Sequence, residues 1–230
     1  MPSISVIIPA FNEAESITQV IQDIPNGIHE VIVVNNGSTD ATESNAKQAG
    51  ATVLTEPRKG YGYACLKGMD YLAKQNNHPD IVVFLDGDYS DYPEEMTKLI
   101  QPITENKVDF VIGARVKRLR EKGSMTGPQI FGNALATTLM KYLFGSTFTD
   151  LGPFRAIKYD KLLALEMEDK TYGWTVEMQL KALKHKLTYT EIPVRYRNRI
   201  GVSKVSGTCK GAVMAGIKIL GWIFKYGLKK

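Results

Sequence analysis

Three aspartates closely follow an apolar stretch in "FLDGDYSDYPEE", residues 84–95. Asp86 and Asp88 form a D-x-D pair, and Asp91 follows three residues later. If the apolar stretch is a β-strand, side chains two residues apart point to the same side, so the paired carboxylates can share one ligand. Carboxylate oxygens suit Mg²⁺ or Mn²⁺, and such an ion also binds diphosphate oxygens. The pattern predicts a divalent-metal site at the end of a strand.

Two other interpretations of these aspartates exist. A helix-loop-helix calcium loop also begins D-x-D-x-S, but it needs Gly at its sixth position and Glu at its twelfth. Those positions hold Asp91 and Thr97, and a strand precedes them, so this interpretation fails. The simpler alternative is an Asp-rich turn that caps a helix beginning at Pro93, and Asp91 suits that role.

Composition indicates a soluble globular protein. The chain has 230 residues, of which 43% are apolar, and this length suits one domain with an appendage. Only Cys65 and Cys209 and three widely separated histidines are present, so we expect neither a disulfide framework nor a Cys/His zinc site. The sequence shows no N-terminal signal region and no run of about 18 apolar residues, which favours a cytoplasmic location.

Charge is unevenly distributed along the chain. The net charge is +5, yet nine Lys and Arg residues and no Asp or Glu follow Glu191, so the residues up to Glu191 carry −4. Blocks of one sign commonly mark interaction surfaces. Nucleic acid, anionic lipid or a phosphorylated small molecule would each suit this basic end, and a solvated tail is the simpler alternative.

Short β-branched runs alternate with helical patterns through residue 115. The runs are continuously apolar, which is typical of strands in a sheet covered on both faces. This alternation predicts a doubly wound α/β half with a mostly parallel sheet, in which a ligand lies beyond the carboxyl ends of the strands. We expect strands at 4–10, 30–36, 51–56, 80–86 and 109–115, and helices at 13–24, 40–49, 61–74 and 93–103, with Asp40 and Pro93 at helix starts.

A different pattern begins at about residue 124. No Gly/Ser/Pro linker separates it from the first half, so we expect one compact domain over residues 1–207, followed by an appendage at 208–230. The expected elements are a helix at 127–145, a short strand at 152–158, an amphipathic helix at 175–185, a strand at 187–197 and a last helix at about 208–226.

Gly60 and Gly62 in "RKGYGYA" partly match a dinucleotide-binding fingerprint. The match lacks the third glycine and does not follow the first strand, which argues against a hydride-transfer enzyme. Small residues at this point would still let the backbone approach a ligand. A plain turn before a helix is the alternative.

Seven segments together resemble the family 2 glycosyltransferases, which have the Rossmann-like GT-A fold. They are "VIIPAFNEAESI", "VIVVNNGSTDAT", "GYGYA", "FLDGDYSDYPEEM", "IGAR", "DLGPFRAI" and "RYRNRIGVSKVSG", in the family's order and at roughly its spacing over residues 4–210. Within the family, the chain is similar to the dolichyl-phosphate mannose synthase and polyprenyl-phosphate glycosyltransferase group. The resemblance implies a nucleotide-sugar half at 1–115 and an acceptor half at 116–207.

The resemblance assigns the donor site to residues of the first half. Asp86 would contact the ribose or the metal, Asp88 would be the principal ligand of Mg²⁺ or Mn²⁺, and Ser90 would supply a further ligand. The nucleotide sugar would otherwise lie against Pro9, Asn12, Glu13, Asn36, Asp40 and Gly60.

Four basic residues are placed like those that hold diphosphate or acceptor phosphate in the family. They are Arg115, Arg155, Arg199 and Lys204, of which Arg199 and Lys204 would act in catalysis. A divalent cation and these side chains would stabilise the negative charge that forms on the leaving diphosphate. Each could instead be an ordinary surface cation.

The resemblance implies transfer of a hexose from a UDP or GDP sugar, with inversion by direct in-line attack. A polyprenyl (dolichyl or undecaprenyl) phosphate is the acceptor we expect, and its dianion needs no general base. A saccharide hydroxyl would need a carboxylate to accept its proton. Asp150 is the first candidate for that base and Glu177 is the second, and either could instead be structural.

Several residues depart from the family pattern. Asn35 and Asn36 stand where many relatives have two aspartates, which leaves the donor base open. Pro153 replaces a different small residue of the mannose synthases, and Gln129 lies near the place of an expected basic residue. These departures leave the sugar and the acceptor open.

The segment "GAVMAGIKILGWIFKYGLKK" predicts a basic amphipathic helix. Lys218, Lys225 and Lys229 fall on one face, and apolar residues cover most of the remainder. Such a helix suits a membrane interface better than a bilayer span, so we expect peripheral association with the cytoplasmic face of a membrane, beside a lipid-linked acceptor. Packing onto the domain and a homodimer contact are the alternatives.

Two other classes of protein fit the sequence less well. A nucleotidyltransferase should show a Gly-rich phosphate loop after the first strand, and "PAFNEAES" is not one. A nonenzymatic nucleic-acid-binding protein would explain the basic end but not Asp86 and Asp88. We therefore expect a glycosyltransferase without a nucleic-acid partner.

Overall fold

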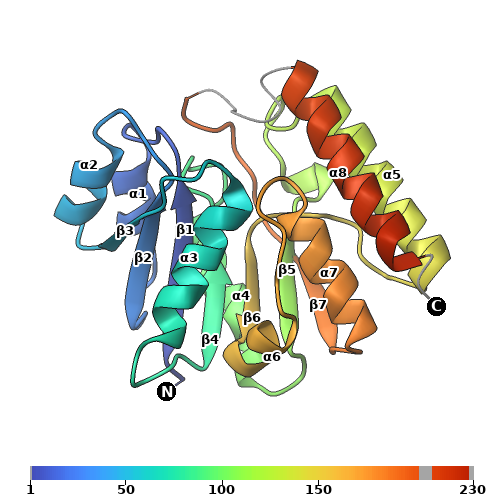
Figure 1. Cartoon of the computed structure of the whole chain (residues 1–230), viewed down its shortest axis with the longest axis horizontal. Helices are drawn as coiled ribbons and strands as arrows, with labels where there is room; N and C mark the ends of the chain where they lie inside the picture. The colour runs from blue at the N-terminus through green and yellow to red at the C-terminus, as the bar shows by residue number, and fades with distance from the viewer. Residues whose placement is uncertain (1, 202–208, 228–230) are drawn as a thin grey trace.

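A seven-stranded sheet forms the centre of the molecule (Figure 1). The computed structural model describes residues 2–201 and 209–227. The strands are β1 (Ile4–Ala10), β2 (Glu30–Asn35), β3 (Thr52–Thr55), β4 (Ile81–Phe84), β5 (Phe110–Ala114), β6 (Arg155–Lys158) and β7 (Tyr189–Pro193). The helices are α1 (Ile17–Gln22), α2 (Thr42–Gln48), α3 (Tyr61–Ala73), α4 (Met96–Thr104), α5 (Gly127–Phe144), α6 (Tyr159–Ala164), α7 (Trp174–Lys184) and α8 (Cys209–Gly227), with 3₁₀ turns at Pro93–Glu95 and Lys117–Leu119.

The strand order is β3-β2-β1-β4-β6-β5-β7. β1 pairs in parallel with β2 and β4, β3 pairs in parallel with β2, and β7 pairs in parallel with β5. β6 is antiparallel to both of its neighbours, β4 and β5. The sheet is therefore mixed but mostly parallel, as the sequence predicts.

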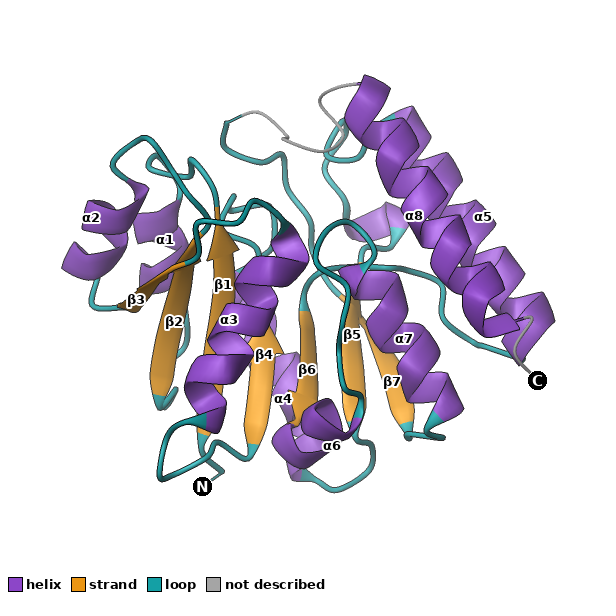
Figure 2. Ribbon diagram, in the orientation of Figure 1, coloured by secondary structure: helices purple, strands orange, loops and turns teal. Residues whose placement is uncertain are grey.

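Apolar side chains form a buried cluster on each face of the sheet. In β1, Ile7 joins one cluster while Val6 and Ile8 join the other, because successive side chains in a strand point to opposite faces. The first cluster includes residues of α3, α5, α7 and α8, and the second includes residues of α1 and α4. Figure 2 shows α3 and α7 in front of the sheet and α4 behind it. The continuously apolar strands are thus covered on both faces.

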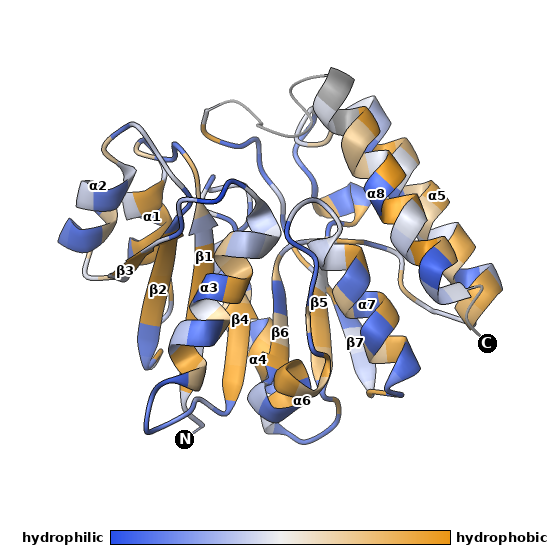
Figure 3. Ribbon diagram, in the orientation of Figure 1, coloured by the Kyte–Doolittle hydropathy of each residue, from blue (hydrophilic) through white to orange (hydrophobic). Residues whose placement is uncertain are grey.

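The C-terminal helix α8 lies alongside α5 and also packs on α7 (Figure 2). Trp222 Nε1 donates a hydrogen bond to Asp169 Oδ2 at 2.6 Å, and Lys225 Nζ lies 2.8 Å from Glu168 Oε1. One face of the predicted amphipathic helix therefore packs onto the domain. Figure 3 shows the mixed hydropathy of α8, whose exposed apolar side chains are Val213, Met214, Ile217 and Phe224. None of the helices described is both long and apolar enough to cross a bilayer.

Most of the predicted helices and strands are present, but many of them are shorter than predicted. The helix predicted at 13–24 begins only at Ile17, because Glu13 and Ser16 form a turn before it. The helix predicted from Pro93 starts as a 3₁₀ turn and becomes α-helical at Met96. The short helix α6 was not predicted, and Thr208 lies outside the described residues.

Candidate active site

The loops after β1 and β2 are joined at the carboxyl edge of the sheet. The Asn12 N–H donates to Ser38 Oγ at 3.0 Å, and the carboxylate of Asp40 accepts hydrogen bonds from the N–H groups of Ala14 and Thr42. β1 lies between β2 and β4, and the Ser16 hydroxyl donates a hydrogen bond to the Gly87 carbonyl at 2.7 Å, so the loop after β4 meets the loop after β1. The structure therefore brings together most of the predicted donor residues, namely Pro9, Asn12, Glu13, Asn36, Asp40, Asp86, Asp88 and Ser90.

Asn36 holds the segment that carries Gly60. Its Oδ1 accepts a hydrogen bond from the Gly60 N–H at 2.8 Å, and its Nδ2 donates to the carbonyl oxygens of Glu56 and Arg58. A Cβ atom on Gly60 would lie 2.2 Å from the Lys170 carbonyl oxygen, and the φ angle of Gly60 is +150°. The glycine thus allows the chain to approach its own backbone, and the side-chain amide of Asn36 is occupied by these loop contacts.

Asp88 is buried, and both oxygens of its carboxylate are bonded. Oδ1 accepts hydrogen bonds from the Ser90 N–H at 2.9 Å and the Ser90 hydroxyl at 2.5 Å, and Oδ2 lies 2.6 Å from Arg199 Nη2. The same guanidinium lies 3.7 Å from Glu13 Oε1. The Ile200 N–H donates to the Asp88 carbonyl, so the chain around Arg199 runs beside the acidic loop. The predicted cation and the predicted metal ligand are therefore in direct contact.

Asp86 and Asp91 carry buried oxygens that have no hydrogen-bond partner within the described part of the chain. These oxygens are Oδ1 of Asp86 and both carboxylate oxygens of Asp91. Burial and the negative charge of Asp88 raise the pKa of Asp86 to about 6. Burial, with the charges of Asp86 and Asp88, also raises the pKa of Asp91. Buried carboxylates are costly unless a cation compensates their charge.

The acidic loop fits a divalent cation. Asp86 Oδ1 is an unpartnered hard ligand beside the carboxylate of Asp88. Within residues 2–201 and 209–227, no three His, Cys, Asp or Glu side chains gather closely enough to form a complete metal cage. Mg²⁺ is usually held by one or two carboxylates together with substrate phosphates, so a D-x-D pair with a diphosphate is a sufficient ligand set.

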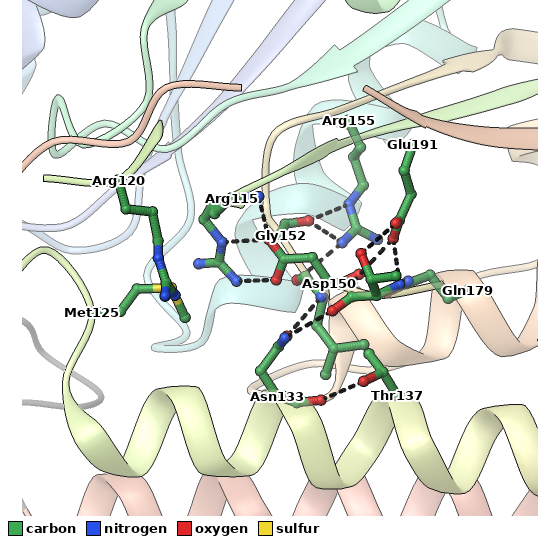
Figure 4. Close-up of polar contacts among 12 residues, drawn as sticks. Arg115, Arg120, Met125, Asn133, Thr137, Asp150, Gly152, Arg155, Gln179 and Glu191 are labelled. Carbon is green, nitrogen blue, oxygen red and sulfur yellow. Dashed lines mark hydrogen bonds and ion pairs between the residues drawn. The ribbon is translucent and has the colours of Figure 1, made fainter. Parts of the chain in front are cut away.

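Arg115 and Asp150 form a buried, bidentate ion pair (Figure 4). Arg115 Nε donates to Asp150 Oδ2 at 2.8 Å, Nη2 donates to Oδ1 at 2.7 Å, and the backbone N–H of Arg115 donates to Oδ2 at 2.7 Å. Burial alone would raise the pKa of Asp150, but the charge and hydrogen bonds of Arg115 outweigh it and lower that pKa. A carboxylate with a lowered pKa and both oxygens occupied is poorly suited to accept a proton.

Arg155 and Glu177 lie in the protein interior. Arg155 is fully buried, and its guanidinium donates to the carbonyl oxygens of Leu151, Gly152 and Thr175, so the geometry argues against the predicted contact with phosphate. Burial also lowers the pKa of Arg155 to about 10. The carboxylate of Glu177 accepts the N–H groups of residues 168 and 169 and pairs with Lys181 at 2.8 Å. The structure thus gives both side chains structural contacts, and Lys204 lies outside the described residues.

A cavity of about 410 Å³, which the sequence does not predict, lies beside the ion pair. It lies between the segment after β5 and helix α5. Among its lining residues are three further cations, Lys117, Arg120 and Lys141. Lys117 and Arg120 belong to the basic run "GARVKRLR", which can be recognised in the sequence. Lys141 is distant in sequence, and only the fold brings it to the same cavity.

The fold and the acidic loop define an α/β enzyme that uses a nucleotide sugar, with the GT-A architecture. The family described as Glycosyl transferase family 2 matches residues 5–165, and the chain belongs to that family. It is therefore a glycosyltransferase, as its sequence predicts.

Curated relatives carry the same class of activity in their names. The glycosyltransferase AglJ of Haloferax volcanii is 31% identical over 199 residues, which cover 86% of this chain and 64% of AglJ. A dolichyl-phosphate hexose transferase of Haloferax volcanii is 29% identical over 218 residues, which cover 92% of this chain and 90% of that relative. The chain thus spans a little under two thirds of AglJ and nearly all of the second relative.

A solved structure confirms the fold. Glucosyl-3-phosphoglycerate synthase from Mycobacterium tuberculosis, in complex with Mn²⁺, UDP-glucose and phosphoglyceric acid, superimposes with a TM-score of 0.77. The match covers 98% of this chain and 80% of the synthase at 22% sequence identity. The similarity establishes the GT-A fold predicted from sequence.

Proposed function

We propose that this enzyme transfers a hexose from a nucleoside-diphosphate sugar to a polyprenyl phosphate, with inversion at the anomeric carbon. The proposal rests on the contacts of the two predicted bases, Asp150 and Glu177, because these contacts occupy both carboxylates. Asp150 is neutralised by Arg115, and Glu177 is held by Lys181 and two backbone N–H groups. The second pKa of a phosphomonoester is near 6, so such an acceptor is mostly dianionic at neutral pH and needs neither residue as a base.

Donor binding falls to the residues at the carboxyl edge of β1, β2 and β4. Asp86 and Asp88 would hold Mg²⁺ or Mn²⁺, which would neutralise charge on the diphosphate as the glycosidic bond breaks. Arg199 contacts Asp88 in the structure and would stabilise the same developing charge. Asn12 and Asp40 would stay in place through their loop contacts and shape the nucleoside end of the site.

A lipid-linked acceptor implies work at a membrane surface. The exposed apolar residues of α8 suit a membrane interface, whereas Lys218 and Lys225 pair with Asp169 and Glu168 of the domain. The relative named a dolichyl-phosphate hexose transferase supports this class of acceptor. We place the enzyme on the cytoplasmic face of its membrane as part of the proposal.

The test is an acceptor panel with radiolabelled UDP- and GDP-hexoses. Polyprenyl phosphate should accept label, the matched polyprenol should not, and Asp88→Ala should abolish transfer. Extracting the product into organic solvent and hydrolysing it with mild acid would identify a sugar phosphate ester. Label transferred only to free saccharides would refute the proposed acceptor while leaving the glycosyltransferase class intact.

A further inference from the structure

The loop that carries the predicted metal ligands has an unfavourable backbone conformation at Tyr89. The φ angle of Tyr89 is +62°, in the left-handed region that a bulky side chain rarely adopts. Tyr89 lies between Asp88 and Ser90, so its torsion angles set how the carboxylate and the hydroxyl of these neighbours are oriented. Such a conformation persists only where surrounding contacts hold it. The geometry of the acidic loop therefore depends on the residues that hold Tyr89 in place.

Arg197 binds three successive backbone carbonyls of this loop. Its Nε donates a hydrogen bond to the Tyr89 carbonyl at 2.7 Å, and its Nη2 donates to the Asp91 carbonyl at 3.2 Å. The backbone N–H of Arg197 donates to the carbonyl between them, that of Ser90, at 2.9 Å. These bonds fix the direction in which the three carbonyl groups point, and with it the backbone path of the loop.

Aromatic contacts hold the same guanidinium. Arg197 Cζ lies 3.3 Å from the centroid of the Tyr89 ring and 4.1 Å from the centroid of the Tyr92 ring. The Tyr89 hydroxyl donates a hydrogen bond to Asp23 Oδ2 at 2.5 Å. The Tyr89 side chain is thus held by Arg197 at its ring and by Asp23 at its hydroxyl. Only a planar guanidinium can stack on a ring and donate two directed hydrogen bonds at once, so lysine would not replace arginine here.

The segment that contains Arg197 also contains Arg199, which pairs with the predicted metal ligand. Arg199 Nη2 lies 2.6 Å from Asp88 Oδ2, and the next residue, Ile200, donates its N–H to the Asp88 carbonyl at 3.0 Å. Because Arg197 is bonded to the acidic loop two residues earlier, it fixes where the backbone of Arg199 lies relative to Asp88. Arg197 makes its own bonds to backbone carbonyls, so its effect on the Asp88 carboxylate is indirect.

We propose that Arg197 is a positioning residue of the site for the metal and the diphosphate. It holds residues 88–91 in their unfavourable conformation and keeps Arg199 beside Asp88, so that the carboxylates and the cation are arranged before the donor binds. This inference rests on the metal site of the proposed function and adds to it a residue that acts through the loop backbone.

The test compares Arg197→Gln and Arg197→Lys with Arg195→Gln. Arg195 is a matched control, because it lies two residues away in the same segment and also contacts the Tyr92 ring, at 4.0 Å. Its guanidinium donates to the carboxylates of Glu94 and Glu95 instead of the loop carbonyls. Arg197→Lys keeps the positive charge, so a defect in this variant reports on the lost hydrogen-bond geometry and stacking.

Amide hydrogen exchange of the metal-free protein, followed by NMR, measures whether the loop is held. The Ile200 amide should exchange about tenfold faster or more in Arg197→Gln, because its bond to the Asp88 carbonyl opens more often. Arg195→Gln should exchange like the wild type at this amide. The amides of β1 should keep their rates in all variants, which separates a local change in the loop from a loss of global stability.

Mn²⁺ binding separates this inference from the proposed function. Mn²⁺ is titrated in the presence of UDP and, in parallel, of GDP, and the free ion is followed by electron paramagnetic resonance. Both Arg197 variants should weaken Mn²⁺ binding about tenfold, and Arg195→Gln should bind like the wild type. Wild-type binding that Arg197→Gln retains, or an unchanged exchange rate at Ile200, would overturn the positioning role alone. A wild type that binds no Mn²⁺ with either nucleotide would refute the proposed metal site and the positioning role together.

Discussion

The carboxylate of Asp150 and the guanidinium of Arg115 meet through two parallel N–H···O bonds, with side chains that are only 6% and 11% exposed. The pair joins the end of β5 to the segment before β6, and both residues line the same cavity. Breaking such a pair strands one charge in the interior.

Asp150→Asn should therefore destabilise the protein, because Arg115 would lose its counter-ion. The expected loss is about 3 to 5 kcal/mol, or on the order of 10 °C in Tm for a chain of this size. Thermal unfolding followed by circular dichroism measures it. Asp160→Asn, which removes one partner of the exposed Lys161–Asp160 pair, should leave Tm unchanged. Equal Tm values for the wild type and Asp150→Asn would mean that the pair does not form in solution.

The raised pKa of Asp86 predicts a pH-dependent stability in metal-free protein. The pKa of Asp86 is about 6 in the folded protein, so this carboxyl binds a proton more readily in the folded protein than in the unfolded chain. The ionised carboxylate therefore lowers the free energy of unfolding above about pH 6, and this destabilisation becomes smaller as the pH falls through that value. Asp86→Asn should be more stable than the wild type by roughly 1 to 3 kcal/mol at pH 8, with a smaller difference at pH 5.

Urea titrations with EDTA at the two pH values measure this difference. Asp70→Asn is the control, since Asp70 forms an exposed pair with Lys74. A constant difference between Asp86→Asn and the wild type across the pH range would contradict the predicted titration.

Nucleotide binding should stabilise the protein only with a divalent metal and an intact Asp88. A ligand at 100 times its Kd adds about 2.7 kcal/mol, which corresponds to roughly 5 to 10 °C here. A thermal-shift panel of UDP, GDP and their sugars, each with and without Mn²⁺, would identify the donor base. Asp88→Ala should remove the metal-dependent part of the shift. A shift that persists in that variant would place the metal elsewhere.

Gly62→Ala should destabilise the protein strongly, since an added Cβ would lie 2.0 Å from the Asp169 carbonyl oxygen. Gly221 in α8 has no atom within 4 Å of the same position, so Gly221→Ala should stabilise the helix by about 0.5 to 1 kcal/mol. Chemical denaturation of both variants tests the pair. Similar stabilities would mean that the loop carrying Asp169 can move away from α3 at little cost.

Membrane association predicts that an acidic substitution on the outer face of α8 weakens vesicle binding. Ile217 is 61% exposed, and Ile217→Asp places a negative charge where apolar contact is expected. Flotation with vesicles rich in anionic lipid should show a several-fold loss. Leu163→Asp, at a 44% exposed apolar residue of α6, should bind like the wild type. If both variants lost vesicle binding equally, or if neither lost it, the result would contradict a specific role for α8 in membrane binding.

The elements with local sequence signals were predicted well. Strand β1 has the predicted ends, since its largely apolar run starts directly after Ser3 and packs on both faces of the sheet. The D-x-D pair was located because Asp86 and Asp88 directly follow the apolar run of β4, and that order places them at the carboxyl edge. The chemistry of this edge can be inferred from residue type and spacing alone.

The features that depend on distant pairing were not predicted. Arg155 begins β6, and its inward orientation follows from the antiparallel pairing of β6 with β4 and β5, which local sequence does not encode. The pairing of Arg115 with Asp150 spans 35 positions, so neither residue alone showed that the other neutralises it. Lys141 reaches the cavity only because α5 folds back beside the segment after β5.

The position of β6 also constrains the order of events during synthesis. β6 comes from the second half of the chain but lies between β4 and β5, two strands of the first half. Until about residue 158 has left the ribosome, those two strands each lack their shared neighbour and leave backbone N–H and C=O groups unpaired. A nascent chain that pauses before β6 would expose one open edge of β4 and both edges of β5, because β7 also comes later, and such edges are sites for pairing with other chains. Completion of the sheet, and with it the Arg115–Asp150 pair, is therefore a late step of co-translational folding.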